Sequence, residues 1–149
     1  ELKLSCGEEL MIFKCNGVKM AIILSTDVFY PQVARFAAMQ GVELVLSPIA
    51  MIKPTSFLRQ LSGLWQNVQQ NIFFAIESAY HGEFVANSFF AKSIIHAPLE
   101  LTENEDGLLK VSDDEMVTAT LPLEMLTWAK QFYHPIRQLN TLAYRKIFK

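Results

Sequence analysis

The sequence predicts an α/β fold in which a mixed β-sheet is covered by helices. Two short, nearly continuous apolar runs, Met20–Leu24 and Val42–Leu46, flank a helical pattern at Pro31–Gln40. Such runs are typical of strands buried on both faces, and a strand–helix–strand unit makes its strands parallel through a right-handed crossover. From Gly82 onward, short segments between turn residues predict antiparallel strands. We therefore expect one α/β domain over residues 1–149, with a parallel core and later antiparallel strands.

The remaining elements follow from local patterns. Leu10–Lys14 predicts a first strand, because Gly17 offers a turn directly after it. Ser56 is a suitable N-cap for a second helix that runs to about Gln70 with apolar residues on one face, and Ile72–Ile76 again has the composition of a buried strand. Further strands are expected at Glu83–Ala86, Lys92–His96 and Glu115–Leu121, with a turn at Asn104–Gly107, a helix from Pro122 to Phe132 and a last helix opened by Pro135.

Composition excludes several classes of partner. The 13 basic and 15 acidic residues are spread along the chain, for a net charge of −2, so no stripe is available to neutralise phosphates or anionic lipid. The five-residue run Met20–Leu24 is far shorter than the roughly 20 residues of a membrane span. Charges near the start, at Glu1, Lys3, Glu8 and Glu9, break up any signal-peptide core, so we expect a cytoplasmic protein.

The apolar content is high for a chain of this size. Charged residues make up 19% of the sequence, below the roughly 25% of soluble domains, and the mean hydropathy is +0.21. Either the core is large, or an apolar face awaits a partner.

Common catalytic and cofactor motifs are missing from the sequence. It contains no glycine-rich phosphate loop, no Cys/His metal spacing and no Gly-x-Ser-x-Gly elbow, so we expect no cofactor and no metal. His81, His96 and His134 are expected to be ordinary surface or boundary histidines. Cys6 and Cys15 are expected to be reduced thiols in a packed interior.

The stretch from Gly17 to Arg35 resembles the nucleophile region of the nitrilase superfamily, the carbon–nitrogen hydrolases. That family has a glycine, a buried strand, Cys-Tyr-Asp, an aromatic residue before Pro-Glu, and an arginine four residues after the proline. Asp27, Tyr30, Pro31 and Arg35 match this pattern in order. The similarity extends over nearly the whole chain, through Gly7-Glu-Glu-Leu10, Gly41, Pro48, Trp65, Gln69-Gln-Asn71 and Phe90-Ala-Lys-Ser-Ile-Ile-His-Ala-Pro98.

The resemblance implies the C-terminal half of a nitrilase-type α-β-β-α sandwich. It also implies hydrolysis of an amide or nitrile by a cysteine nucleophile, a glutamate base and a supporting lysine. Ser25 stands at the nucleophile position, Thr26 replaces the tyrosine and Gln32 replaces the glutamate after the proline. The family's glutamate and lysine lie before the glycine that corresponds to Gly7, so we expect them in an N-terminal half that this chain does not contain.

Ser25 is the main candidate for a site residue because it stands at the nucleophile position. The exchange of cysteine for serine makes it a weak nucleophile. A serine hydroxyl attacks only with a base placed to take its proton, and the sequence identifies none. We favour a vestigial Ser25 over a working nucleophile. The amide N–H of Thr26 is placed to face a carbonyl oxygen, Asp27 either orients a site group or caps a turn, and Arg35 either makes a buried ion pair or lies on a solvated helix face.

Two classes of function remain open. The first is a carbon–nitrogen hydrolase relative that acts on a small amide or nitrile and is inactive or incomplete as this chain, a pseudoenzyme. The second is a non-catalytic assembly module that keeps the fold. In both cases a half-sandwich leaves one sheet face to be covered by a missing N-terminal half or a second copy, so we expect association. The resemblance implies a homo-oligomer joined through the helix at Pro31–Gln40 and the C-terminal helices.

Overall fold

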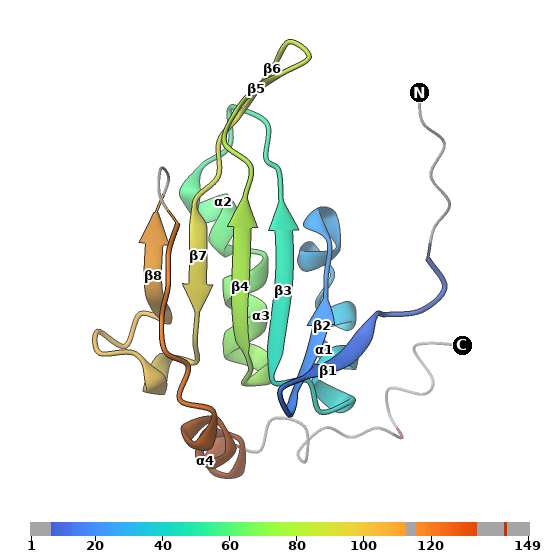
Figure 1. Ribbon diagram of the computed structural model, residues 1–149, viewed down its shortest axis with the longest axis vertical. Helices are drawn as coiled ribbons and strands as arrows, with labels where there is room; N and C mark the ends of the chain where they lie inside the picture. Colours follow the sequence, from blue (N-terminus) through green and yellow to red (C-terminus); the bar gives the residue numbers. More distant parts are fainter. Residues whose placement is uncertain (1–6, 113–115, 134–141, 143–149) are drawn as a thin grey trace.

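The computed structural model describes residues 7–112, 116–133 and 142 and shows a six-stranded mixed sheet with the strand order β1-β2-β3-β4-β7-β8 (Figure 1). The predicted α/β fold with a mixed sheet is confirmed. In chain order the elements are β1 (Ile12–Cys15), β2 (Val18–Ile22), the 3₁₀ turn η1 (Ser25–Phe29), α1 (Pro31–Met39), β3 (Leu44–Ile49), α2 (Phe57–Leu61), α3 (Leu64–Asn71), β4 (Phe74–Ala79), β5 (Gly82–Phe84), β6 (Asn87–Phe89), β7 (Ser93–His96), the 3₁₀ turn η2 (Leu99–Leu101), β8 (Leu108–Ser112) and α4 (Leu123–Tyr133).

The predicted parallel core is present at the centre of the sheet. Strands β2 and β3 pair in parallel with Ala21 opposite Val45, β3 pairs in parallel with β4, and α1 is the crossover between β2 and β3. Strand β2 begins two residues before the predicted run, at Val18, because the Asn16–Gly17 turn pairs it with β1 as a hairpin. Both Asn16 and Gly17 have positive φ, which this tight hairpin turn requires.

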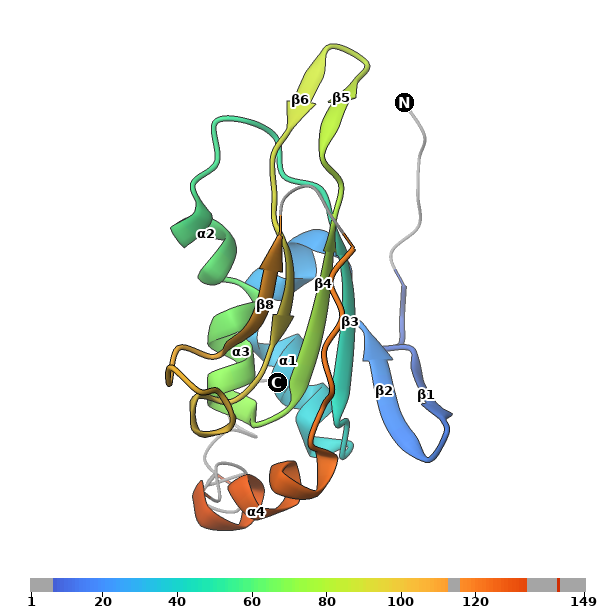
Figure 2. The ribbon, with the colours of Figure 1, turned by 60° about the vertical axis from the view of Figure 1, so that its left-hand side comes forward.

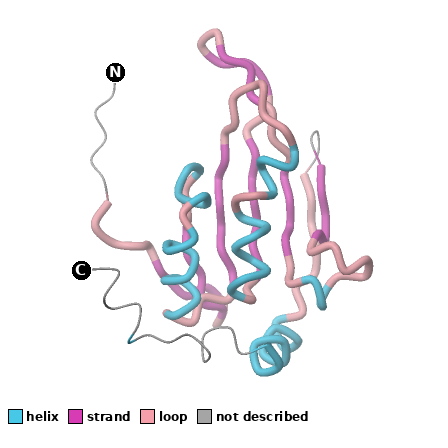
Figure 3. Tube along the Cα trace, turned by 180° about the vertical axis from the view of Figure 1, so that it is seen from behind, coloured by secondary structure: helices cyan, strands magenta, loops and turns pink. Residues whose placement is uncertain are grey.

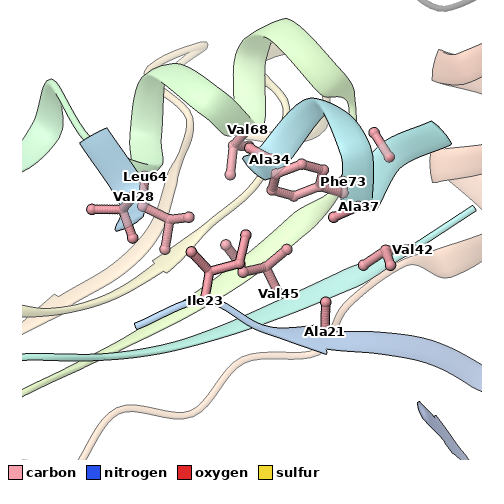
Figure 4. Packing of buried hydrophobic residues seen from close by; sticks show 12 residues of the cluster. Ala21, Ile23, Val28, Ala34, Ala37, Val42, Val45, Leu64, Val68 and Phe73 are labelled. Atoms are coloured by element: carbon pink, nitrogen blue, oxygen red, sulfur yellow. The ribbon is translucent and has the colours of Figure 1, made fainter. Parts of the chain in front are cut away.

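The helices after β2 and β3 cover one face of the sheet. Figures 2 and 3 show α1 and α3 side by side on this face, and their buried side chains meet those of the strands in one apolar cluster. Figure 4 shows this cluster, in which Val45 from β3 and Ile23 lie under Val28, Leu64 and Val68. We call this the helix-covered face.

The opposite face is covered mainly at one end. Leu44 and Phe74, at the starts of β3 and β4, pack against Leu126 and Ala129 of α4. Farther along the same face, Leu46 of β3 and Ile76 of β4 are only half-buried. We call this second surface the open face.

The predicted second helix is divided into two. Ser56 caps α2 as expected, since its Oγ accepts from the Arg59 N–H at 3.1 Å, but the helix stops at Leu61 and α3 starts at Leu64. Gly63 lies at the junction, where a Cβ atom would come within 2.8 Å of Val28 Cγ2. The division therefore brings the backbone close to the turn after β2.

The later strands differ from the prediction in two places. The strand predicted at Glu83–Ala86 is instead part of a hairpin of β5 and β6, with Val85 and Ala86 in its turn at positive φ. Strand β7 confirms Lys92–His96, but the next strand of the sheet is β8, at Leu108–Ser112, and residues 116–121 form no strand. The prediction of a strand at Glu115–Leu121 is therefore wrong over residues 116–121, while Glu115 lies outside the described residues. The strand after the turn at Asn104–Gly107 was placed too far along the chain, because this turn leads directly into β8. The predicted Pro122–Phe132 helix is confirmed as α4, and the helix predicted from Pro135 falls almost wholly outside the described residues.

The prediction of a buried Cys15 is also corrected. Cys15 is exposed, at the end of the edge strand β1, and Cys6 lies outside the described residues.

Within the described part of the chain, no helix has the length and apolar character that a membrane crossing requires.

Candidate functional site

Ser25 lies at the carboxyl end of β2, where the chain leaves the sheet. The Ile23 N–H donates to Leu46 O at 3.0 Å, so the parallel pairing extends to the residue two positions before Ser25. Ser25 itself is half-buried and has φ of +30°, in a region that serine rarely adopts. Strained backbone of this kind is concentrated at functional sites, and the carboxyl edge of parallel strands is where open α/β sheets bind ligands.

The turn η1 places the neighbouring candidates beside Ser25. Thr26 and Asp27 are both exposed, and the Asp27 backbone closes the turn: its N–H donates to Leu24 O at 2.8 Å and its carbonyl accepts from Tyr30 N–H at 3.1 Å. Arg35 lies on α1 and is half-buried. The structure thus brings Ser25, Thr26 and Asp27 into one turn and places Arg35 on the helix that follows it.

The α2–α3 junction holds this turn from the helix-covered face. Val28 is buried against Gly63, and Asn67 Nδ2 donates to Val28 O at 2.6 Å. The Arg59 guanidinium lies over the Phe29 ring, 4.6 Å from its centroid. One residue of α2, one of α3 and the glycine between these helices therefore contact the two residues that follow Asp27.

A buried polar cluster of Gln60, Glu77 and His96 is the main feature that the sequence did not indicate. Glu77 Oε2 accepts from Gln60 Nε2 at 3.0 Å and lies 3.1 Å from His96 Nε2, and all three side chains are almost fully buried. Gln60 also bonds both backbone groups of Lys92, donating to its carbonyl at 2.7 Å and accepting from its N–H at 3.0 Å. The cluster therefore ties α2 to β4 and β7.

The prediction for His96 is wrong as a result, because this histidine has no exposed surface. Strand β7 is buried on both faces in its second half, and a histidine among isoleucines gives no periodic signal of burial. One signal was available in the sequence. Glu77 lies on the neighbouring strand, and its carboxylate could have been recognised as a buried partner for the histidine. His81 is exposed as expected, and His134 lies outside the described residues.

Lys130 of α4 has an unusual electrostatic environment at the other end of the sheet. Burial lowers its pKa from the ordinary 10.5, and the nearby Glu43 carboxylate partly opposes this shift. Its Nζ donates to Val42 O at 3.3 Å. Because Val42 precedes β3 while Ser25 follows β2, the lysine lies away from the Ser25 turn.

Comparison with known proteins gives a distant curated relative. No family model matches the sequence. The chain is 24% identical over 144 residues to a probable hydrolase, YhcX, of Bacillus subtilis strain 168, covering 92% of this chain and 28% of that protein.

Solved structures give a broader likeness. An amidase from Nesterenkonia sp. AN1, in a glutamate-to-glutamine mutant with the acetamide moiety of fluoroacetamide added covalently at its active-site cysteine, matches with a TM-score of 0.75 and 16% identity. The match covers 96% of this chain and 49% of the amidase. A cysteine-to-serine mutant of the same amidase, described as of the nitrilase superfamily, matches with a TM-score of 0.66 and 20% identity over 88% of this chain. The chain therefore has the fold of nitrilase-superfamily amidases and spans about half of their length.

Proposed function

We propose that this nitrilase-type chain is the C-terminal half of a carbon–nitrogen hydrolase that acts on an amide or nitrile, with Ser25 at the nucleophile position. The observation that carries the proposal is the strained turn at the carboxyl end of β2, where Ser25 has φ of +30° and leads through η1 into α1. The resemblance of Asp27, Tyr30, Pro31 and Arg35 to the family's nucleophile region supports the same assignment.

We propose further that residues 1–149 alone are catalytically silent. Within the described part of the chain, no side-chain acid or base is hydrogen-bonded to the Ser25 hydroxyl. A hydroxyl without a base is a poor nucleophile, whereas a cysteine thiol is already partly ionised near neutral pH. The Thr26 N–H could still donate to an oxyanion, but no oxyanion forms when the hydroxyl at position 25 does not attack.

The missing parts of such an active site belong, in this proposal, to a second half-sandwich. The half-buried Leu46 and Ile76 leave apolar surface on the open face, which a second sheet would bury. That half would supply the glutamate and the lysine. It would be an N-terminal segment of a longer protein or a separate chain.

The second candidate function is a non-catalytic assembly module. The serine at position 25 favours it, as does the outer surface of α1, where Phe36 and Met39 are both about half-exposed. A module of this kind would keep the fold for contacts between subunits and would need no base near Ser25.

The coding sequence that precedes Glu1 separates the two candidates. A glutamate and a lysine in a preceding half-sandwich favour the enzyme, and a preceding sequence without them favours the module. If both are present, the extended protein is assayed for ammonia release from simple amides and nitriles. We expect Ser25→Cys to raise its turnover and Ser25→Ala to abolish it, because only the thiol or hydroxyl can form the covalent intermediate. Equal turnover by all three proteins would contradict the role of position 25.

A further inference from the structure

We infer that Asn67 is a positioning residue that sets the conformation of the Ser25 turn, and hence the direction of the side chain at position 25. The inference rests on the proposed role of Ser25. It gives α3 a role in positioning the turn. The resemblance to the family did not suggest this role, because on this helix it rested on Trp65 and residues 69–71 and not on Asn67.

One buried amide group joins two segments of the chain. Asn67 Nδ2 donates to Val28 O in η1 at 2.6 Å and to Gly63 O at the α2–α3 junction at 3.1 Å. Asn67 is only 3% exposed. Its side chain therefore fixes the distance between the turn and the helix junction from inside the protein.

Packing alone does not require an asparagine at position 67. Val28, Leu64 and Val68 around it belong to the apolar cluster of Figure 4. Burying an amide among apolar side chains costs free energy that only its hydrogen bonds offset. The Asn67 Oδ1 atom has no partner among the described residues. Within that part of the chain, the two hydrogen bonds made by Nδ2 are therefore the ones that offset the free energy of burying the amide.

The helix junction leaves space for the turn. At Gly63 a Cβ atom would come within 2.8 Å of Val28 Cγ2 and 3.1 Å of Phe29 Cε1. The absence of a side chain there lets η1 approach α3 closely enough for the short bond to Val28 O. Glycine and asparagine thus act together, the first by leaving space and the second by bonding across it.

The turn needs support because its first residue is strained. The Asp27 N–H donates to Leu24 O and the Tyr30 N–H to Asp27 O at the two ends of η1, while Ser25 is held at a positive φ. A strained residue keeps its conformation only when its surroundings determine it. Loss of the Asn67 bond should therefore loosen the segment that carries position 25 before it loosens the rest of the fold.

Asn71 provides a matched control on the same helix. It is 1% exposed, and its Nδ2 donates to Asn67 O at 2.8 Å, within α3 and without a bond to η1. Replacing either asparagine with alanine removes a buried amide from α3. Only the Asn67 replacement removes a bond to the turn.

The test combines hydrogen exchange with the reactivity of a thiol at position 25. In a protein with Cys6→Ser, Cys15→Ser and Ser25→Cys, position 25 carries the single thiol, and its alkylation by iodoacetamide is followed by mass spectrometry. Because Ser25 is half-buried, opening of the turn should limit this reaction. We expect Asn67→Ala to raise the alkylation rate and the exchange of the Asp27 and Tyr30 amides about fivefold, the increase in local opening that corresponds to one lost buried hydrogen bond. Asn71→Ala should leave both within about twofold.

The outcomes separate this inference from the proposed function. Turn exchange and alkylation that do not change in Asn67→Ala, or that change equally in Asn71→Ala, overturn the positioning role whatever the enzyme assays show. Silence of the extended protein in the ammonia assay overturns the proposed function and leaves the exchange result standing. If Asn67→Ala does not fold, Asn67→Ser, whose hydroxyl is too short to reach Val28 O well, takes its place with the same expected outcome.

Discussion

At the scale of single residues, the buried polar cluster should contribute strongly to stability. Replacing Glu77 with alanine leaves His96 Nε2 and a Gln60 N–H without their acceptor inside the protein. We expect Glu77→Ala to lower the free energy of unfolding by about 3 kcal/mol, because an unpaired buried polar group keeps its full desolvation penalty. Urea unfolding measures this loss, with exposed Glu83→Ala as the control. Equal stability of the two variants would show that the cluster contributes nothing.

Lys130 predicts a dependence of stability on pH. Its pKa in the folded protein is below the ordinary 10.5, so between these values the unfolded chain binds more protons. The free energy of unfolding therefore rises with pH through this window. The increase is complete above the pKa of the lysine in the unfolded chain. We expect wild type to gain stability relative to Lys130→Met between about pH 7 and about pH 10. Urea midpoints at the two pH values measure the difference, and an unchanged or reversed difference would contradict the buried, partly desolvated ammonium.

Sequence reasoning can place residues that are adjacent in the chain, but it cannot place those that meet only in the fold. Ser25, Thr26 and Asp27 were found together because one turn contains them. Gln60, Glu77 and His96 come from α2, β4 and β7, and nothing in the spacing of a single sequence indicates that they meet. The exposed Cys15 was missed for a related reason, because burial of an edge strand depends on what lies beside it.

At the scale of elements, the break between α2 and α3 is a requirement of packing against the turn. Hydrophobic spacing from Ser56 to Gln70 predicts one continuous helix, and the only local warning was Gly63. The pattern records which faces are buried, whereas the break is set by how closely η1 approaches. The central strands were predicted well, since residues buried on both faces show their environment in composition alone.

Gly63→Ala tests this account of the break. The new methyl group would meet the buried, stiff side chain of Val28 at 2.8 Å, so the turn or the helix must shift. We expect a loss of about 1–3 kcal/mol in the free energy of unfolding, as for other overpacked cores. Gly7→Ala, where the nearest atom would be 3.9 Å away, is the matched control and should be nearly neutral. A Gly63→Ala protein as stable as wild type would mean that the junction tolerates a side chain.

At the scale of the whole molecule, the exposed apolar surfaces predict association. Phe36 and Met39 are each 49% exposed on α1, and the open face adds half-buried aliphatic side chains. Surfaces of this kind in a soluble protein usually mark an interface or a tendency to aggregate.

Sedimentation of the 149-residue chain at several concentrations measures this association. We expect concentration-dependent oligomers, weakened by Phe36→Asp because the charge opposes burial of that surface. Leu58→Asp, at a site 76% exposed on α2, should leave the oligomers unchanged. A stable monomer at all concentrations would contradict the expectation. If both variants weakened the oligomers equally, the result would show that α1 is not the specific contact.

Whether position 25 is catalytically silent in the 149-residue chain is tested by an assay for ammonia release with a panel of simple amides and nitriles. Among the described residues, no acid or base is bonded to the Ser25 hydroxyl, so we expect no turnover above the blank for wild type. We expect none for Ser25→Cys either, because each missing catalytic group costs on the order of 10³-fold in rate. Robust turnover by wild type that Ser25→Ala abolishes would contradict the account, since it would show a working nucleophile whose partners lie among these residues.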